Sequence, residues 1–315
     1  MTTTERTPLV SIGLPVYNGE RFLREAIDSI LAQTFTDFEL IISDNASTDA
    51  TNAICLEYAA RDPRVRYVRN ERNMGASYNY NRVTELSRGK YIRHAAYDDV
   101  LAPTNIERCV EVMEADDGIS LCYPQMSRID EHGRIIDTFT DSLDLPETDP
   151  VARWRRFHEL CDADSMCDPV FGLFRGSVLK STPVLGRFAS ADVILLAEVA
   201  LRGRVHEVRE VLFFERWFPG TSVNANRTPD DRAAWFDPNA RGRWENHCPH
   251  YRWLTEYIAT IGRAPLTAQQ KLACLAVLAP WIWKNKHGLV VGPAALALKL
   301  AGMERLAIRT SARWL

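Results

Sequence analysis

The chain has 315 residues, of which 46% are hydrophobic and 25% are charged. This composition excludes a disordered or fibrous chain and is typical of a globular protein with one large domain and an appendage. The formal net charge is only −3, and we expect no nucleic-acid partner. The charge is uneven, however, because residues 266–315 hold seven basic side chains and one acid, while the remainder carries a net charge of −9. A basic segment on an acidic body predicts an anionic partner surface for that segment.

Three further features bear on the cellular compartment. The seven cysteines are scattered without any C-x-x-C spacing, which indicates reduced, mostly buried thiols. Residues 1–7 are polar and lack the apolar region of a secretory signal. The longest apolar run, Leu272–Trp283, is interrupted by Pro280 and is too short to span a bilayer. We therefore expect a cytoplasmic protein, placed at the inner face of the plasma membrane if its basic segment binds lipid.

Strand and helix patterns alternate in the first third of the chain, at a spacing of roughly 25 residues. Strands are expected over 9–16, 38–42, 65–68 and from 91, with helices over 20–33, 49–61 and 76–87 between them. This alternation predicts a Rossmann-like α/β fold, a mostly parallel sheet with helices on both faces. No G-x-G-x-x-G or Walker motif follows the first strand, which disfavours dinucleotide binding of the dehydrogenase kind.

The fourth strand runs into two adjacent carboxylates, Asp98 and Asp99, and Pro103 follows four residues later. In an open α/β sheet, ligands bind at the carboxyl ends of the strands. Two neighbouring carboxylates repel each other, and a divalent cation that faces a phosphate group would relieve this repulsion. The alternative is that both acids begin a turn and cap a helix whose first turn holds Pro103.

The pattern changes after a helix expected over 104–115. A β-hairpin is expected from 119–126 and 134–137, then a helix over 150–161, a strand over 170–174, a helix over 188–198 and a strand over 205–214. Residues 219–246 are rich in Pro, Asn, Asp and Arg, which predicts a long mobile loop. From about residue 247 the chain is expected to be helical.

Several short motifs, in this order, resemble glycosyltransferase family 2, whose members have the GT-A fold. They are Val10–Asn18, Leu31–Phe35, Ile41–Asp49, Asn73–Gly75 and Gly89–Ile92, followed by the acidic pair and Pro103. The resemblance covers about residues 8–217. It implies a GT-A catalytic domain over 1–218, with nucleotide-sugar binding at about 8–103 and the acceptor half at about 104–218. A variable loop over 219–246 and a helical C-terminal extension over 247–315 would follow.

The resemblance also assigns the donor site. The residues that would lie against the nucleotide base and ribose are Pro15, Tyr17, Asn18, Asp44, Arg72 and Asn73. Asp44 would hydrogen-bond the base, and the loop of Arg72 would close over the base or the ribose. Two alternatives stay open: Asp44 as a cap for the next helix, and Arg72 as a solvated surface charge.

Asp98 matches the last acid of the family's Asp-x-Asp signature. It would hold a divalent metal, Mn²⁺ or Mg²⁺, which neutralises charge on the donor diphosphate. Ala96 stands where the first acid of that signature is usual, and this departure weakens the predicted metal site. Asp99 would orient the donor sugar or cap the following helix.

Asp192 matches the acid of the family's Glu-Asp helix. It would act as the general base that takes the proton of an acceptor hydroxyl in a single, inverting displacement; the alternative is a favourable contact with the helix dipole. Arg216 would contact the diphosphate, or form an ion pair with Glu215 or another neighbour. Ala191 and Phe218 stand where relatives carry Glu and His, two further departures from the family pattern.

The acceptor is harder to predict. Trp235, Phe236, Trp244 and Tyr251 fall where acceptors bind in the family, although aromatic residues more often pack in a core. Residues 289–315 predict a basic amphipathic helix that lies on an anionic membrane or packs on the catalytic domain.

The resemblance as a whole implies transfer of a sugar from a nucleotide-diphosphate sugar, in our interpretation a UDP-sugar. The acceptor would be a saccharide or a lipid-linked saccharide in cell-surface polysaccharide or glycoconjugate synthesis. A nucleotidyltransferase is disfavoured, because no Gly-rich basic loop follows the first strand. The remaining alternative, motivated by Ala96, Ala191 and Phe218, is a non-catalytic sugar-nucleotide-binding or scaffold protein.

Overall fold

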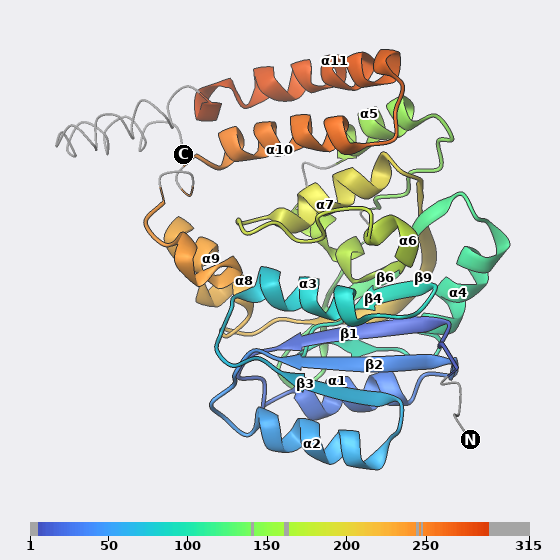
Figure 1. Cartoon of the computed structure of the whole chain (residues 1–315), viewed down its shortest axis with the longest axis vertical. Helices are drawn as coiled ribbons and strands as arrows, with labels where there is room; N and C mark the ends of the chain where they lie inside the picture. Colours follow the sequence, from blue (N-terminus) through green and yellow to red (C-terminus); the bar gives the residue numbers. More distant parts are fainter. Residues whose placement is uncertain (1–5, 140–141, 161–163, 244–245, 247, 290–315) are drawn as a thin grey trace.

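One β-sheet runs through the described part of the chain (Figure 1). The computed structural model describes residues 6–139, 142–160, 164–243, 246 and 248–289. Within them, nine strands join in the order β3-β2-β1-β4-β8-β6-β9-β5, and β7 pairs with β6. Their bounds are β1 Val10–Val16, β2 Phe38–Asp44, β3 Val65–Arg69, β4 Tyr91–His94, β5 Val100–Leu101, β6 Ile119–Ile129, β7 Ile135–Thr138, β8 Leu173–Arg175 and β9 Arg204–Arg216.

The first half of the sheet is parallel. β1 pairs with β2 on one side and with β4 on the other, and β2 pairs with β3. Helices α1 (Leu23–Leu31) and α2 (Thr51–Arg61) connect β1 to β2 and β2 to β3, in one direction along the sheet. Helix α3 (Ala76–Leu86) connects β3 to β4, in the opposite direction. Because such crossovers are right-handed, α3 lies on the opposite face of the sheet from α1 and α2. Every residue of β1 and β2 is therefore buried. The predicted α/β fold is confirmed here.

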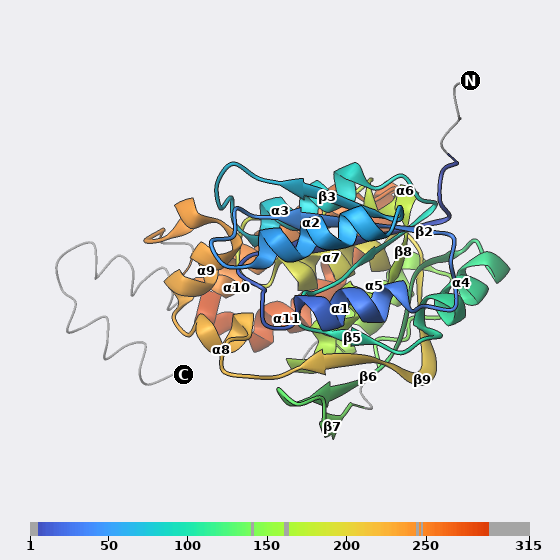
Figure 2. The same cartoon turned by 90° about the horizontal axis from the view of Figure 1, so that it is seen from below.

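The second half of the sheet is mixed. β8 is antiparallel to both β4 and β6, while β6 and β9 are parallel. The sheet extends from β3 on one side to β9 and β7 on the other (Figure 2). The short strand β5 pairs with β9 so that Val100 lies opposite Phe214. This pairing brings the acidic residues before β5 close to the end of β9.

The predicted boundaries near residues 103 and 170 differ from the structure. The strand expected over 170–174 begins only at Leu173, because residues Asp164–Phe171 form a 3-10 helix, η1. Pro103 lies two residues before α4 (Asn105–Ala115) rather than in its first turn, and the residue before α4, Thr104, makes no side-chain cap. The predicted helix and hairpin on either side are confirmed: α4 itself, the pair β6–β7, and α5 (Pro150–Leu160).

The prediction of a long mobile loop over 219–246 is wrong. This segment contains α8 (Ser222–Ala225), α9 (Pro229–Phe236) and the 3-10 turn η2 (Pro238–Ala240). The Thr228 hydroxyl accepts the Asp231 N–H, and Pro229 follows at the first helical position. The Asp237 carboxylate likewise accepts the Asn239 N–H. The polar residues that indicated a loop are thus capping residues of short helices.

The last described helices pack on the body of the protein. Helices α10 (Pro249–Arg263) and α11 (Ala268–Lys284) lie beside α5 and α7 (Ala191–Ala200), near the short α6 (Gly176–Leu179) (Figure 1). Trp154 of α5 is fully buried, and its Nε1 donates a hydrogen bond to the carbonyl of Cys274 in α11. The buried Glu198 of α7 pairs with Arg263 of α10 at 2.7 Å. Helices on both sides of the predicted boundary at residue 218 therefore share one hydrophobic cluster.

None of the helices in the described ranges is long and apolar enough to cross a membrane. Apart from residue 289, the predicted membrane-binding segment 289–315 lies outside the described residues, as does Trp244.

Candidate active site

The carboxyl ends of β1, β2 and β3 meet at one edge of the sheet. The strand register places Val16 opposite Asp44, and Asp44 opposite Arg69. Pro15 is buried within β1 opposite Ser43, whereas Tyr17 is exposed just beyond the strand. The structure therefore brings the predicted base-binding positions of the first two strands together at this edge of the sheet.

Asn18 ties the loops after β1 and β2 to each other. It has a positive φ of 53°, a conformation that asparagine adopts more readily than most residues. Its Oδ1 accepts the Thr48 N–H at 2.8 Å, and its own N–H donates to the Ser47 hydroxyl at 2.9 Å. Its side-chain oxygen is thus already engaged in shaping this edge.

Asp44 at the end of β2 is completely buried and accepts three hydrogen bonds. Oδ1 accepts the Ser47 N–H at 2.8 Å, and Oδ2 accepts the Tyr67 hydroxyl at 2.9 Å and Arg69 Nη1 at 2.8 Å. The alternative that Asp44 caps the next helix is wrong, because α2 begins only at Thr51 after Ala50. A buried carboxylate is stable here because it is paired with a guanidinium and fully hydrogen-bonded.

The loop before α3 joins this edge. The Asn70 N–H donates to the carbonyl of Asp44 at 2.8 Å. Asn73 Oδ1 accepts the Gly75 N–H and Asn45 Nδ2, each at 2.9 Å. Arg72 is exposed, and its Nε lies 3.3 Å from the Met74 sulfur. Asn73 therefore shapes the loop, and Arg72 is the residue of the pair whose side chain reaches solvent.

Asp98 and Asp99 follow β4, beside the end of β9. Asp98 is half-buried, and none of the other described residues donates a hydrogen bond to its carboxylate. Burial raises the pKa of Asp98 to about 7, with a further contribution from the charge of Glu215. Burial, and then the charge of Asp98, raise the pKa of Asp99 well above its usual range. The protein alone does not balance the negative charge that this pair carries when ionised, and a cation would stabilise the ionised form.

Arg216 at the end of β9 fastens this acidic loop. Its backbone N–H donates to Asp99 Oδ1 at 2.9 Å, and its Nε donates to the carbonyl of Asp98 at 2.9 Å. The alternative that Asp99 caps α4 is therefore wrong, because its carboxylate faces β9 instead. Arg216 therefore holds the carboxylate of Asp99 and the backbone carbonyl of Asp98.

The Arg216 guanidinium is almost completely buried. Its Nη1 donates to the carbonyl of Asp130, its Nη2 lies 2.7 Å from Glu25 of α1, and it stacks over Phe22. The sequence left open an ion pair of Arg216 with Glu215 or with another neighbour. The partner is Glu25, because Glu215 pairs with Arg128 instead. Phe218, in place of the family's His, packs edge-on against Phe22. The diphosphate contact of Arg216 stays a prediction.

Asp192 lies in the first turn of α7, and its Oδ1 accepts the N–H of Val193 at 3.0 Å. The residue before the helix, Ser190, has a positive φ of 63°. The half-buried Tyr80 of α3 is affected by several acids at once: desolvation, followed by the charges of Asp98, Asp99 and Asp192, raises its pKa far above the usual range. The acids of the loop after β4 and the acid in the first turn of α7 thus both act on Tyr80.

Sequence reasoning missed two charged residues near these acids. Asp168 of η1 has its pKa raised to about 8, first by burial and then by Glu215, and Asp192 adds to the effect. Arg93 of β4 is only 1% exposed, and its Nε and Nη1 have no hydrogen-bond partner among the described residues. Arg93 lies within a buried strand and Asp168 follows other acids without a recognisable spacing, so neither formed a motif that could have been recognised.

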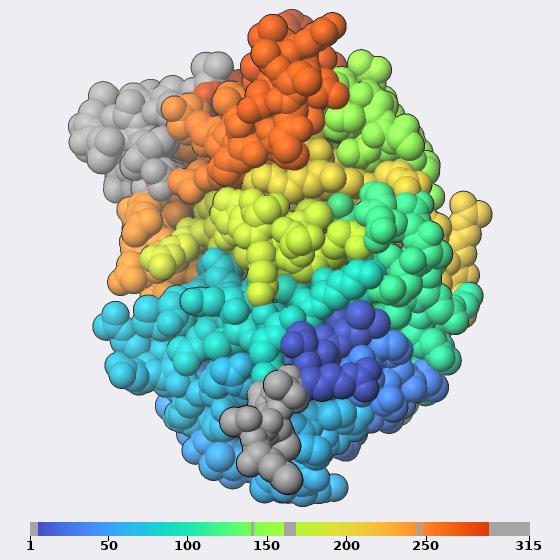
Figure 3. Space-filling view, turned by 45° about the vertical axis from the view of Figure 1, so that its right-hand side comes forward, coloured from blue at the N-terminus to red at the C-terminus, as the bar shows by residue number. Residues whose placement is uncertain are grey.

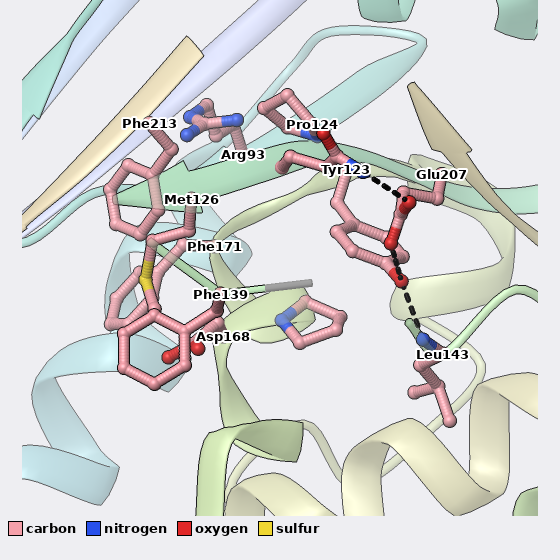
Figure 4. A pocket seen from close by; sticks show the side chains of 12 residues that line it. Arg93, Tyr123, Pro124, Met126, Phe139, Leu143, Asp168, Phe171, Glu207 and Phe213 are labelled. Carbon is pink, nitrogen blue, oxygen red and sulfur yellow. Dashed lines mark hydrogen bonds between the residues drawn. The ribbon is translucent and has the colours of Figure 1, made fainter. Parts of the chain in front are cut away.

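Arg93 and Asp168 line the same pocket, which lies between β6, β9 and η1 (Figure 4). Aromatic side chains fill much of its wall, and Glu207 accepts a hydrogen bond from the Tyr123 hydroxyl at 3.2 Å. The free volume is about 20 Å³, which is enough for about one water molecule. In this conformation the pocket is too small for a sugar ring.

The donor set at Asp98 fits a metal that is shared with a substrate. No group of three or more His, Cys, Asp or Glu side chains in the described ranges could enclose a metal ion. Mg²⁺ and Mn²⁺ at phosphate-transfer sites commonly use one or two carboxylates and take the other ligands from substrate phosphates and water. The half-buried Asp98 carboxylate meets the first requirement, so metal binding here would depend on the phosphorylated ligand.

A Rossmann-like sheet with acids gathered at its strand ends defines an α/β enzyme domain that binds its ligand at that edge. A family model described as Glycosyl transferase family 2 matches residues 11–181, more than half of the chain. The chain belongs to glycosyltransferase family 2.

Two relatives and two solved structures place this membership in context. Chondroitin synthase from Escherichia coli is 37% identical over 134 residues, which make up 42% of this chain and 19% of that protein. An uncharacterized glycosyltransferase from Methanocaldococcus jannaschii is 37% identical over 134 residues, 42% of this chain and 46% of that protein. The match thus spans less than half the length of either relative.

The solved structures share the fold. S. aureus TarS 1–349 in complex with UDP-GlcNAc has a TM-score of 0.63 at 18% identity, over 95% of this chain and 79% of that chain. The mannosyltransferase PcManGT from Pyrobaculum calidifontis, in complex with GDP-Man and Mn²⁺, has a TM-score of 0.50 at 17% identity, over 98% and 87% of the two chains. The GT-A expectation for the fold is confirmed.

Proposed function

We propose that this chain is an inverting glycosyltransferase that takes its sugar from a nucleotide-diphosphate sugar, with UDP as the nucleotide. The observation that carries the proposal is the acidic loop of Asp98 and Asp99, which Arg216 fastens beside the end of β9 in a chain that belongs to glycosyltransferase family 2. A metal-binding acid and a general base must act close to the same reacting bond. The UDP-GlcNAc complex of S. aureus TarS supports the donor class, and the chondroitin synthase of Escherichia coli supports polysaccharide synthesis as the setting.

The nucleotide would bind where β1, β2 and β3 end. The proposed contacts are those expected from the sequence: Pro15, Tyr17, Asn18, Asp44, Arg72 and Asn73. Because the Asp44 carboxylate is buried behind Arg69, a direct hydrogen bond to the base would require the partly exposed Arg69 side chain to move aside. Tyr17 and Arg72 need no such change, since both are exposed at this edge.

Asp98 would hold Mn²⁺ or Mg²⁺ together with phosphate oxygens of the donor. A bound metal supplies positive charge that stabilises the leaving diphosphate. Asp99 and Arg216 would fix the position of Asp98 through the hydrogen bonds between β9 and the acidic loop. The Mn²⁺ in the PcManGT structure supports a metal at this kind of site.

Asp192 would act as the general base. Its carboxylate would take the proton of the acceptor hydroxyl as that oxygen forms a bond to the anomeric carbon. The bond from this carbon to the diphosphate oxygen breaks at the same time, and the nucleotide diphosphate leaves with the electron pair. One such displacement inverts the anomeric configuration. The first turn of α7 favours the ionised form that a base needs.

The acceptor would be a saccharide, free or linked to a lipid, presented at the cytoplasmic side of the membrane. Trp235, Phe236 and Tyr251 are the described aromatic residues of the region expected to bind it. Trp235 and Tyr251 are partly exposed and could stack on a sugar ring.

The test of the proposal is the Asp192→Asn variant. Transfer should fall by at least about a hundredfold, because general base catalysis contributes that much or more, while UDP binding measured by calorimetry should stay within about twofold. Asp117→Asn is the matched control, because the Asp117 side chain is 88% exposed. Loss of UDP binding, or unchanged turnover, would refute the role of Asp192. Titrations with UDP, GDP and dTDP, each with and without Mn²⁺, would identify the nucleotide and the metal requirement.

A non-catalytic sugar-nucleotide-binding protein is the second candidate. Two observations favour it: Ala96 leaves only the adjacent acids for a metal, and Phe218 packs on Phe22 where a further metal or diphosphate contact is expected in the family. The same titrations separate the two candidates. UDP binding without any hydrolysis or transfer, unchanged by Asp192→Asn, would favour the second.

A further inference from the structure

Helix α11 has two apolar faces, and only one of them is covered. Cys274 and Leu278 are buried against α5 and α10. On the opposite side, Leu272 is 68% exposed, Leu275 40% and Trp283 71%. These three residues follow each other at intervals of three and eight positions, which places them along one stripe of a helix. Large exposed apolar side chains gathered in one stripe mark an interaction surface.

The charge around this stripe has one sign. Residues 268–289 contain Lys271, Lys284 and Lys286 but no Asp or Glu. The Lys286 ammonium lies 3.6 Å from the centre of the Trp283 ring, so basic and aromatic groups occur together at the C-terminal end of the helix. Residues 1–265, in contrast, carry a net charge of −9. The protein is electrically polarised, and α11 belongs to its positive part.

The position of α11 leaves its outer face accessible to a large surface. It is the outermost labelled helix, at the opposite end of the molecule from α2 (Figure 1). The space-filling view likewise has the C-terminal helices at one end and the β1–β3 half at the other (Figure 3). A flat partner could therefore approach α11 without meeting the half of the molecule that holds β1–β3.

We propose that the outer face of α11, formed by Leu272, Leu275 and Trp283, docks on an anionic lipid surface, with Lys284 at the end of the helix and Lys286 just beyond it. The apolar side chains enter the boundary between headgroups and acyl chains, and the lysines remain at the level of the phosphates. Tryptophan beside lysine is a pairing suited to that boundary. The acidic body points away from the membrane, because like charges repel it.

Two other occupants of this face fit less well. A second copy of the chain, packed symmetrically on α11, would bring basic residues against basic residues. Residues 290–315 carry four basic residues and one acid, so packing of that segment on α11 would have the same defect. An anionic lipid surface is the occupant that complements both the apolar stripe and the charge.

The experiment measures sedimentation of the full chain with vesicles of phosphatidylcholine alone or mixed with phosphatidylglycerol. The wild type should bind the anionic vesicles and not the neutral ones, and added salt should weaken binding. Leu272→Gln combined with Trp283→Gln should reduce the partition by at least about tenfold. Lys284→Gln and Lys286→Gln should each reduce it by about fivefold, the factor equivalent to about 1 kcal/mol per lysine.

The matched control is Ile135→Gln combined with Ile136→Gln. These two residues of β7 are 61% and 53% exposed, so the control removes similar apolar surface elsewhere and should leave vesicle binding unchanged. Leu272, Trp283, Lys284 and both β7 positions are exposed and Lys286 is half-buried, so melting temperatures should stay close to that of the wild type. UDP binding in solution should also be unchanged, which separates this proposal from that of the enzymatic function.

Five results would overturn the proposal. Four of them are absence of binding to anionic vesicles, equal binding to neutral ones, equal loss in the β7 control, and a dimer that the α11 substitutions convert to a monomer. The last result would identify a second copy as the occupant. Loss of binding in Arg305→Gln with Arg309→Gln, with none in the α11 variant, would overturn it in favour of residues 290–315.

Discussion

Replacing Asp98 by asparagine should stabilise the protein in the absence of nucleotide and metal. The structure raises the pKa of Asp98 from an ordinary 3.8 to about 7, mainly through burial. Between these two pH values the unfolded chain holds Asp98 ionised, whereas the folded protein holds it protonated. The folded state thus binds more protons than the unfolded state, so wild-type stability falls as the pH rises from about 4 to about 7.

The size of the effect follows from the same pKa. Each pH unit in that interval corresponds to about 1.4 kcal/mol, so the upper limit is about 4 kcal/mol above pH 7 and about 1.6 kcal/mol at pH 5. Asp98 is half-buried and shares its titration with Asp99, so solvent and coupling reduce both values. We expect a gain of about 1–3 kcal/mol at pH 8 and a clearly smaller gain at pH 5.

The assay is chemical denaturation of both proteins at pH 8 and pH 5, with a chelator present and no nucleotide. Asp117→Asn serves as the control, because its exposed side chain should change stability by less than about 0.5 kcal/mol at either pH. A destabilised variant at pH 8, or an equal gain at both pH values, would refute the reasoning. The same variant should lose metal-dependent UDP binding, as expected of a carboxylate that is kept for function at a cost in stability.

Three further changes test other parts of the structure. Trp154→Ala should destabilise the protein by about 3–5 kcal/mol in chemical denaturation, because the ring is completely buried and bonds Cys274; a loss below about 1 kcal/mol would contradict this packing. Gly75→Ala should cost about 1–3 kcal/mol, because φ is +86° and a Cβ would lie 2.4 Å from the carbonyl oxygen of Phe236; an unchanged melting temperature would speak against it. Arg93→Met should raise stability by about 1–3 kcal/mol, because two buried guanidinium nitrogens lack partners; destabilisation would mean that Arg93 has a partner in solution.

The parallel half of the fold could be predicted from sequence because its strands are buried on both faces. The run 9–16 contains the observed β1 almost to the residue, and β2 differs from its predicted end by two positions. The second half was predicted less well. In the apolar segment around 164–174, periodicity cannot separate a 3-10 helix from a strand, and η1 replaces much of the expected strand.

Segment 219–246 shows why amino-acid composition alone cannot separate a loop from short helices. Proline, asparagine and aspartate are common both in loops and at the starts of helices. Only the spacing from Thr228 to Asp231, with Pro229 between them, distinguishes the cap of α9 from a turn. An interpretation based on the frequency of these residues alone therefore gave the wrong result.

The candidate site divides in the same way. The acids Asp98, Asp99 and Asp192 were predicted from motifs, and the pairing of β5 with β9 explains why the first two lie beside Arg216. The partner of Arg216 could not be found from neighbours in sequence, because adjacent residues of a strand point to opposite faces. Glu215 meets Arg128 on β6, and Arg216 meets Glu25 on α1. Contacts between distant segments of this kind depend on packing that no local pattern contains.

The shared cluster of α5, α7, α10 and α11 has a consequence for the order of folding during synthesis. The first four strands and their helices lie within residues 10–94, and these strands pair with one another. Trp154 and Glu198, in contrast, obtain Cys274 and Arg263 as partners only after α10 and α11 have been translated. At ribosomal rates of about 5–20 residues per second, the growing chain keeps the apolar faces of α5 and α7 uncovered for several seconds. We expect this interval to be the period when the nascent protein most needs a chaperone.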